Sequence, residues 1–501
     1  MATQIPAQVV RVNPEPHNVT TSNRGQLQEN GDEVFQVSDT GHQIISMWVW
    51  LVDVFELPET TDRDQVVSHL IRGLERALGD HPELTGTMHY DNQARRIVIK
   101  RPERGSVALH IKDASNHTDQ IPSYAWYHEH DYPVHRLEIT QLIPSEATSL
   151  PMEIAKDMET PGPVVVAFQA TFIRGGLIIG SAISHQVSDG LGCDAFMTTW
   201  AAYSKAATTG GPVDLDPKIP PHTLFMAKFK PTPEEWEALR GRYPTMKYNT
   251  APPPPPPADF VPPVVKTRVF HFPRSKLAKL KAECAVALPP GEFVSTYDAV
   301  AALWWRAMLR AKKPLLQIND GDPTHAIHAV NMRKRAGRPI SSRYIGSSVA
   351  LPHSAFVTVG QALGPRETSL PLLARTVRGA THQVTPAYIE GQMAWATGGP
   401  DLRYNELNMP WIMARDCMGF GWHDMNPYAT HDFGFGLPSG FRWPQMGFES
   451  FFFMLPSRSG LKGVGPDEGM EVTFGIEESC FPRLERDEEL LEFCEQRGVG
   501  S

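Results

Sequence analysis

Cysteine is scarce in this chain: five residues out of 501, odd in number and widely scattered, with no Cys-x-x-Cys pair. A disulfide framework of a secreted protein needs paired cysteines, and a thiolate zinc site needs closely spaced ones. The composition therefore indicates a reducing compartment and argues against both kinds of site. The cysteines are Cys193, Cys284, Cys417, Cys480 and Cys494.

An excess of basic charge and long apolar runs are missing as well. Lysine and arginine number 47 against 56 aspartates and glutamates, for a formal net charge of -9 at pH 7. The chain therefore has no basic footprint for nucleic acid or an anionic membrane. The apolar run at residues 44–55 is too short to span a bilayer, and the polar residues 1–31 do not form a secretory signal. We expect a cytoplasmic protein with no membrane span and no nucleic-acid partner.

Three common catalytic motifs are also absent from the sequence. There is no Gly-x-Ser-x-Gly elbow, no phosphate-binding Gly-Lys-Ser/Thr loop and no His-Glu-x-x-His pair, which removes the commonest hydrolase, nucleotide and zinc classes. The stretch most like a metal site is residues 128–131, His-Glu-His-Asp. Its alternating spacing in a polar, aromatic region is more typical of a surface loop, so we expect no metal.

Among what is present, residues 176–192 stand out. Residues 176–183 are an apolar run without polar alternation, which predicts a strand covered on both faces of its sheet. His185 lies at the end of that strand. Ser188 or Asp189 can cap a following helix, and two glycines there let the backbone turn sharply. The predicted helix carries apolar residues at roughly helical spacing: Leu191, Phe196, Trp200 and Tyr203.

His185 is the leading candidate for a catalytic group. A neutral imidazole can take a proton from a hydroxyl or amine as that group attacks a carbonyl. A lone histidine is more often a packed or solvated structural residue, but the strand end, the turn and the helix favour a functional role here. Two roles are open to Asp189: it can accept a hydrogen bond from the ring, or point away and lock the turn through an arginine.

Two further stretches carry weaker signals. Arg333 and Arg335 follow a predicted strand, and they form either a solvated basic turn or a functional pair that binds Asp189 or phosphates. Residues 432–436, Asp-Phe-Gly-Phe-Gly, interleave glycines with aromatics. On its own this pattern is typical of a tight structural turn near a sheet edge.

The length and the pattern of the chain predict an α/β protein with two domains, with three as the alternative. Strand-like and helix-like segments recur in both halves, and residues 252–257 are an unbroken proline run. Such a run is extended and serves as a spacer. We therefore predict four segments: a flexible N-terminal arm, an N-terminal domain, a proline-rich crossover linker and a C-terminal domain, at residues 1–39, 40–213, 214–263 and 264–501.

Taken together, these motifs resemble the BAHD acyltransferase family, whose signatures are His-x-x-x-Asp-Gly and, nearer the C-terminus, Asp-Phe-Gly-Trp-Gly. Residues 185–190 match the first in full, and residues 432–436 match the second except that Phe435 replaces tryptophan. Further stretches similar to family motifs lie at residues 81–86, 295–306, 331–335, 344–346 and 471–473.

The resemblance implies a monomer of two chloramphenicol-acetyltransferase-like domains, each a mixed β-sheet with flanking helices, joined by a crossover linker. A solvent channel between them would bring coenzyme A and the acceptor together at His185. By this analogy Asp189 turns away and pairs with an arginine, first of all Arg333, whose alternative role is to bind the cofactor. Asp432 would hold the geometry of the domains. The long arm and the proline-rich crossover are more similar to fungal members of specialised metabolism.

The resemblance also implies the reaction: transfer of an acyl group, acetyl by default, from acyl-coenzyme A to a hydroxyl, less readily an amine, of a small metabolite. His185 would act as general base, with no covalent acyl-enzyme and no permanently bound cofactor. Trp422 fits the substrate pocket, but Phe420 stands where the family often has a hydroxyl that assists the oxyanion. The alternatives are a condensation-domain-like amide or ester synthase, which usually has a second histidine where this chain has Ser184, and a non-catalytic ligand-binding relative.

Overall fold

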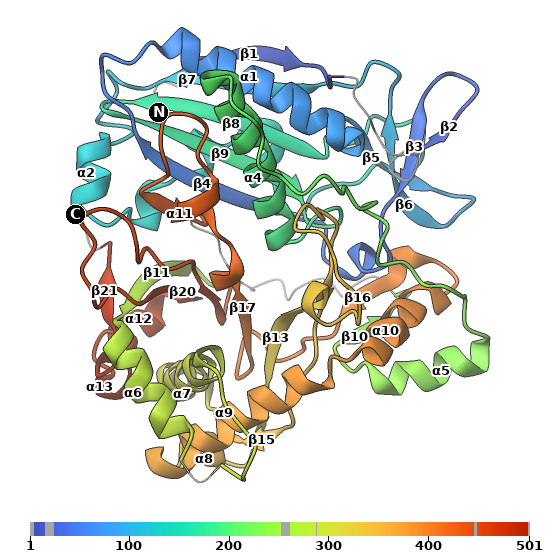
Figure 1. Cartoon of the computed structure of the whole chain (residues 1–501). Helices are drawn as coiled ribbons and strands as arrows, with labels where there is room; N and C mark the ends of the chain where they lie inside the picture. Colours follow the sequence, from blue (N-terminus) through green and yellow to red (C-terminus); the bar gives the residue numbers. More distant parts are fainter. Residues whose placement is uncertain (1–4, 16–24, 252–260, 287, 445–447, 499–501) are drawn as a thin grey trace.

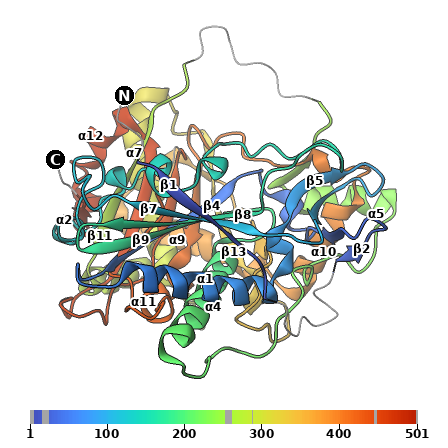
Figure 2. The same ribbon diagram turned by 90° about the horizontal axis from the view of Figure 1, so that it is seen from above.

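The computed structural model describes residues 5–15, 25–251, 261–286, 288–444 and 448–498. Two mixed β-sheets dominate it, one built mainly from the N-terminal half and one from the C-terminal half, each with helices packed on it (Figure 1; Figure 2). The proline run at residues 252–257 falls outside the described residues. Among the helices of the described ranges, none is long and apolar enough to cross a membrane.

The N-terminal sheet has six strands in the order β1-β7-β8-β9-β4-β18. β7 and β8 run parallel, and the other neighbours run antiparallel. Helices α1 (Arg63–Asp80) and α4 (Gly190–Thr209) pack together and close the core over this sheet. The strands are β1 (Ala7–Val12), β4 (Trp48–Glu56), β7 (Val107–Asp113), β8 (Val166–Ile173), β9 (Gly176–Ser184) and β18 (Gly440–Arg442).

The C-terminal sheet has seven strands in the order β14-β13-β17-β19-β20-β11-β21. Its parallel centre, β13-β17-β19, is covered by α6 (Arg274–Cys284), α7 (Thr296–Leu316) and α9 (Arg366–Gln383), which share one core. The strands are β11 (Val265–Phe272), β13 (Ala326–Asn331), β14 (Val349–Ala350), β17 (Cys417–Gly421), β19 (Phe451–Met454), β20 (Met470–Glu477) and β21 (Glu495–Arg497).

Smaller elements surround the two sheets. A four-stranded sheet joins β2 (Gln26–Leu27), β3 (Glu33–Gln36), β6 (Arg96–Arg101) and β5 (Thr87–Asp91), and two strand pairs join β10 (Met246–Tyr248) to β16 (Asn405–Leu407) and β12 (Pro323–Thr324) to β15 (Val357–Thr358). The remaining helices are α2 (Tyr124–Glu129), α3 (Ile139–Leu142), α5 (Pro233–Arg242), α8 (Val359–Ala362), α10 (Pro386–Gly398), α11 (Pro427–Thr430), α12 (Phe481–Leu484) and α13 (Glu488–Leu491).

The N-terminal segment differs from the flexible arm predicted for residues 1–39. Residues 1–4 and 16–24 lie outside the described residues, but β1 pairs along its whole length with β7, and β3 pairs with β6. Val12 and Phe35 are almost fully buried by this pairing. Their partners are distant in sequence, so local composition gave no sign that these short apolar segments extend sheet edges.

The strand pairing also crosses the predicted linker at residues 214–263. β18 comes from the segment assigned to the C-terminal domain, yet it pairs with β4 at the edge of the N-terminal sheet. Within the linker itself, α5 packs on α10, and β10 pairs with β16. The division into residues 40–213 and 264–501 therefore stays a prediction, with one strand exchanged between the halves.

Candidate active site

His185 follows directly on β9, an interior strand of the N-terminal sheet. Every residue of β9 is buried, and the strand pairs with β4 on one side and β8 on the other. The backbone N–H of His185 donates to the carbonyl of Met47 at 2.8 Å, so the ladder continues to the histidine itself. The backbone from which the imidazole projects is therefore fixed by two neighbouring strands.

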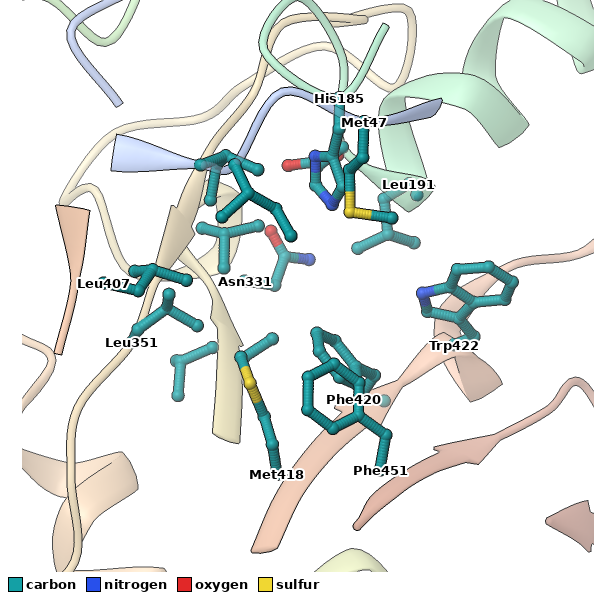
Figure 3. Close-up of a pocket in the computed structure, with 18 of the residues that line it drawn as sticks. Met47, His185, Leu191, Asn331, Leu351, Leu407, Met418, Phe420, Trp422 and Phe451 are labelled. Carbon is teal, nitrogen blue, oxygen red and sulfur yellow. The ribbon is translucent and has the colours of Figure 1, made fainter. Parts of the chain in front are cut away.

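The imidazole of His185 points into a cavity (Figure 3). Its buried Nδ1 atom has no hydrogen-bond partner among the described residues. Burial lowers the pKa of His185 below its ordinary value of 6.5, although its own backbone and the charge of Asp189 oppose the shift. The ring is therefore neutral at pH 7, which is the state that a general base needs.

Asp189 lines the cavity, but its carboxylate is bound by other groups and serves as the N-cap of α4. One carboxylate oxygen accepts hydrogen bonds from the backbone N–H of Gly192 at 2.8 Å and from Arg333 at 3.0 Å. The other accepts from Arg333 at 2.9 Å and from the backbone N–H and hydroxyl of Ser348 at 2.8 and 3.1 Å. Burial alone would raise the pKa of Asp189, but Arg333 outweighs it and the pKa is lowered. Of the two roles left open by the sequence, the structure shows the second.

Arg333 is held on all sides, in the short helix that follows β13. Besides Asp189, its guanidinium donates to the carbonyls of Tyr344 at 3.2 Å and Gly346 at 2.9 Å, and it lies 5.1 Å above the ring of Tyr344. With its donors engaged in this way, Arg333 ties the C-terminal half to the turn after His185. It is not placed to bind a phosphate.

Two glycines of the motif are explained by close contacts. A Cβ atom on Gly192 would lie 2.1 Å from the carbonyl oxygen of Ile345, and one on Gly190 would lie 2.8 Å from the indole nitrogen of Trp422. Neither glycine has a positive φ, so the sharp turn expected from the sequence is not the reason for them. The N-terminal end of α4 instead packs directly on backbone and side chains of the C-terminal half.

The cavity beside His185 has a volume of about 790 Å³ and lies between the two halves. Strands β13, β14, β16, β17 and β19 form its C-terminal side, and the segment before β4 and the start of α4 form its N-terminal side. Most of its lining is apolar: Ile44, Ile45, Met47, Leu191, Val349, Leu351, Leu407, Met409, Met418, Phe420 and Phe451.

A second cavity of about 1000 Å³ adjoins the first, and Ala329, Val330, Asn331 and Gly421 line both. It lies at the N-terminus of α7, where Ser295 caps the helix. Its basic lining residues are Lys334, Arg335 and Arg378.

Asn331, at the end of β13, is the second polar side chain aimed at the first cavity. Its side-chain oxygen accepts a hydrogen bond from the backbone N–H of Arg333 at 3.0 Å. This bond leaves the amide NH₂ group facing the cavity (Figure 3). The sequence singled out Asn331 only as the first residue of the stretch at 331–335, and its orientation could not be read from that stretch.

Phe420 and Trp422 both line the first cavity, at the end of β17. The ring of Phe420 stacks on Phe453 with centroids 4.4 Å apart. Trp422 stacks on Trp443 at 5.0 Å. Trp422 thus lies in the lining of the cavity, its role toward a substrate stays a prediction, and Phe420 contributes an apolar wall.

Asp432 lies outside the lining of both cavities. Its carboxylate accepts from the backbone N–H groups of Gly434 at 2.9 Å and Gly436 at 3.1 Å, and it forms an ion pair with Lys205 of α4 at 2.8 Å. Burial alone would raise the pKa of Asp432, but Lys205 and the two N–H groups lower it. Asp432 therefore closes a turn and fastens it to α4.

A buried charge cluster that the sequence did not single out precedes this turn. His431 is fully buried between Asp53 of β4, at 3.1 Å, and Asp194 of α4, at 3.2 Å. Burial alone would lower the pKa of His431, but the two carboxylates outweigh it and raise the pKa to about 10. Across the parts of the chain that the structure describes, no group of three or more His, Cys, Asp or Glu side chains is placed to hold a metal ion.

Comparison with known proteins adds to this picture. Residues 47–203 match the family model of the trichothecene 3-O-acetyltransferase-like N-terminal domain. The acetyltransferase FGR3 of Gibberella zeae is 26% identical over 93% of this chain and 91% of its own length. The eremophilane O-acetyltransferase ORF8 of Penicillium roqueforti is 23% identical over 88% of this chain and 94% of its own.

Solved structures confirm the fold. TRI101 of F. graminearum, in complex with coenzyme A and deoxynivalenol, superposes with a TM-score of 0.73 at 19% identity, covering 92% of this chain and 99% of that one. Vinorine synthase superposes with a TM-score of 0.63 at 16% identity, covering 99% of this chain and all of that one. The two-domain α/β architecture implied by the motifs is thus the architecture observed.

Proposed function

We propose that this chain, which is a BAHD-type coenzyme A-dependent acyltransferase, transfers an acyl group, acetyl in the first instance, to a hydroxyl group of a small molecule. One observation carries the proposal: a neutral histidine, whose ring is not paired with a carboxylate, faces a largely apolar cavity between the halves. That arrangement suits a base that must remove a proton from a bound alcohol.

The reaction follows from these positions. The acceptor hydroxyl gives its proton to His185 while its oxygen attacks the thioester carbonyl. A C–O bond forms, and negative charge collects on the carbonyl oxygen, where the Asn331 amide is a suitable neutral donor. The C–S bond then breaks, and the thiolate of coenzyme A takes the proton back from His185. The product is an ester, and no atom of the protein is changed.

Direct transfer is favoured over a covalent acyl-enzyme. No serine, threonine, cysteine or lysine of the described residues lines the cavity at His185. Asp189, which does line it, has both carboxylate oxygens engaged by other groups. Ser184, where a condensation domain would have a second histidine, is the last residue of β9 and is buried. Without a nucleophile of its own, the site suits attack by the acceptor itself.

The acyl-coenzyme A, a co-substrate and not a permanent cofactor, is assigned to the second cavity. The two cavities share Asn331 in their linings, and on this proposal the thioester of a donor bound in the second cavity extends past Asn331 to His185. Arg335 lines it and has no carboxylate partner among the described residues; the only hydrogen bond of its guanidinium there is to the carbonyl of Val384 at 3.4 Å. A guanidinium in this state is available to a phosphate of the nucleotide.

The chain is further proposed to work as a monomer in the cytoplasm. All five cysteines are free and buried, as befits a reducing compartment. Residues from one chain supply both sides of the cavity, so the site needs no second copy. The two fungal acetyltransferases among its relatives favour a role in fungal specialised metabolism. Sedimentation velocity at assay concentration should show one species of about 56 kDa.

An assay of thiol release tests the function. The purified protein should release free coenzyme A from acetyl-coenzyme A only when an alcohol acceptor is present, and mass spectrometry should find the acetate ester. Intact-mass analysis after incubation with the donor alone should find an unmodified chain. An acetyl adduct that forms on the protein and is discharged by the acceptor would contradict direct transfer.

A further inference from the structure

The polar side-chain groups at the cavity belong to His185, Asp189, Asn331 and Trp422, and the wall across from the histidine carries none. Figure 3 shows the side chains of His185 and Asn331 close to each other, while Met418, Phe420 and Phe451 lie across the cavity. Leu351 and Leu407 complete the side away from the histidine. A ligand whose reacting group meets His185 therefore places its other end among carbon and sulfur atoms.

Most of the other polar atoms near the cavity are already engaged by protein groups, so few are free to bind a second polar group of the ligand. Both oxygens of Asp189 are occupied, and the side-chain oxygen of Asn331 accepts from Arg333. Arg333 itself is engaged by Asp189 and two carbonyls. The lining thus offers a bound molecule neither a free carboxylate nor a free guanidinium at its far end, as judged from the described residues.

From this distribution we infer, on the basis of the proposed function, that the acceptor is an uncharged alcohol whose hydroxyl meets His185 and whose remaining framework is hydrocarbon. An amine acceptor is protonated at pH 7 and would bring an ammonium ion to a cavity without a counter-ion, which is costly. An acceptor that carries a carboxylate would also bring a charge to a cavity without a counter-ion. A second hydroxyl at the far end would lose its hydrogen bonds to water and find no partner.

The walls of the cavity fit the same class. Two aromatic walls are held rigid by stacking, Phe420 on Phe453 and Phe451 on Phe448 with centroids 5.1 Å apart. Met47 and Met418 have unbranched side chains that adapt to irregular hydrocarbon shapes.

Binding of a matched series to the wild-type protein without donor tests the inference. The probes are n-octanol, octane-α,ω-diol and ω-amino-octanol, which share one chain and differ only at the far end. Calorimetry should find that octanol binds roughly 10- to 100-fold more tightly than the diol, and that the amino alcohol binds more weakly still. Equal or tighter binding of the diol or the amino alcohol, or no binding of octanol, would overturn the inference.

A charge placed at the far side sharpens the test. Leu407 is partly exposed at the end of the short strand β16, so Leu407→Glu can be made without burying a new charge completely. The variant should bind octanol at least about tenfold more weakly and should favour the amino alcohol. Leu316→Glu, on an exposed residue of α7 outside the cavity, is the matched control and should keep the wild-type order. An unchanged order in Leu407→Glu would count against the inference.

Thiol release with acetyl-coenzyme A separates this inference from the function on which it rests. If octanol binds in the predicted order and is acetylated, both stand. If it binds in that order but the wild-type protein releases no thiol, the proposed function fails while the chemistry of the cavity is upheld. If acetylation is observed but the diol and the amino alcohol react as well as octanol, the function stands and the inference falls.

Discussion

At the scale of single residues, His185 has no carboxylate partner. A histidine base is often oriented by a carboxylate on its second nitrogen, but here the carboxylate of Asp189 is bound by Arg333 instead. The position of the ring therefore depends on its backbone, which β4 and β8 hold from both sides. Burial rather than a charged neighbour determines its protonation state.

The pH dependence of the reaction should reflect that burial. Because burial lowers the pKa of His185 below 6.5, the neutral base predominates at every pH above that value. We expect kcat/KM to be flat between about pH 7 and pH 8 and to fall only in more acidic buffer, as the ring is protonated. Initial rates of thiol release across a pH series measure this. A fall that already begins between pH 8 and pH 7 would show that the pKa is raised instead.

Asn331 carries a second prediction at this scale. Asn331→Ala removes the amide that faces the developing oxyanion, so kcat should fall by about 10²–10³-fold with little change in KM for acyl-coenzyme A. Asn331→Asp places a negative charge at the same position and should lose at least as much. Single-turnover rates measure the chemical step directly. If Asn331→Ala keeps kcat within about threefold, the oxyanion is stabilised elsewhere.

At the scale of elements, the turn between β9 and α4 is the joint on which the site depends. Its N-cap, Asp189, is bound by Arg333 and Ser348 of the C-terminal half, so the helix, the turn and the far domain are fastened at one carboxylate. The pair is buried, and a buried charge left without its partner is strongly destabilising.

Arg333→Ala tests this joint. It leaves the Asp189 carboxylate buried without its main partner, so the free energy of unfolding should fall by about 3–5 kcal/mol, and activity should fall with it. Arg333→Lys keeps the charge but not the paired geometry and should lose less. Urea titration measures both. Arg338→Ala, an exposed arginine five positions on, is the control and should change stability by no more than about 0.5 kcal/mol. An unchanged urea midpoint in Arg333→Ala would show that the joint is dispensable.

At the scale of the whole molecule, the two halves are joined by more than a linker. β18 of the C-terminal half completes the N-terminal sheet beside β4. His431, in the segment that leads to β18, lies between Asp53 of β4 and Asp194 of α4. The cavity therefore lies between two halves that are joined by β18, which the C-terminal half contributes to the N-terminal sheet, and by a buried charge cluster.

The charge cluster makes stability depend on pH in a definite direction. Because the pKa of His431 is raised to about 10, the native state keeps this proton above pH 6.5 while the unfolded chain releases it. The contribution is complete below about pH 6.5 and is lost as the pH rises toward 10. The urea midpoint should thus fall between pH 7 and pH 9, and His431→Gln should flatten that fall. Equal pH dependence in the two proteins would contradict the account.

Much of the site was predictable from sequence because its signals are local. The apolar run of β9 ends just before a histidine, and the turn and helix follow within a few residues. The hydrophobic periodicity and the helix-capping residues were therefore enough to predict that His185 follows a strand and that α4 begins after it. The residues alone left Arg333 and Arg335 as possible partners of Asp189 among other roles, and the family resemblance put Arg333 first. The pairing of β1 with β7 and of β18 with β4 could not be predicted. These are short strands whose partners are distant in sequence, and no local pattern encodes such pairing.

Other features depend on orientation, which sequence does not specify. The stretch at residues 331–335 identified Arg333 but not the role of Asn331, because that role depends on which way the amide is turned. The cluster around His431 joins residues from β4, α4 and the segment before Asp432. Such a cluster can be recognised only after the sheets are packed. The one sequence signal for it was a histidine, His431, directly before the second family motif.

The most direct measurement is the turnover of His185→Ala in the thiol-release assay, beside His117→Ala, an exposed histidine of the N-terminal half, as control. If His185 is the general base, its loss should lower kcat by about 10²–10⁴-fold or more, with the melting temperature unchanged and the control fully active. Near-normal turnover of His185→Ala with any accepted acceptor would contradict the central claim.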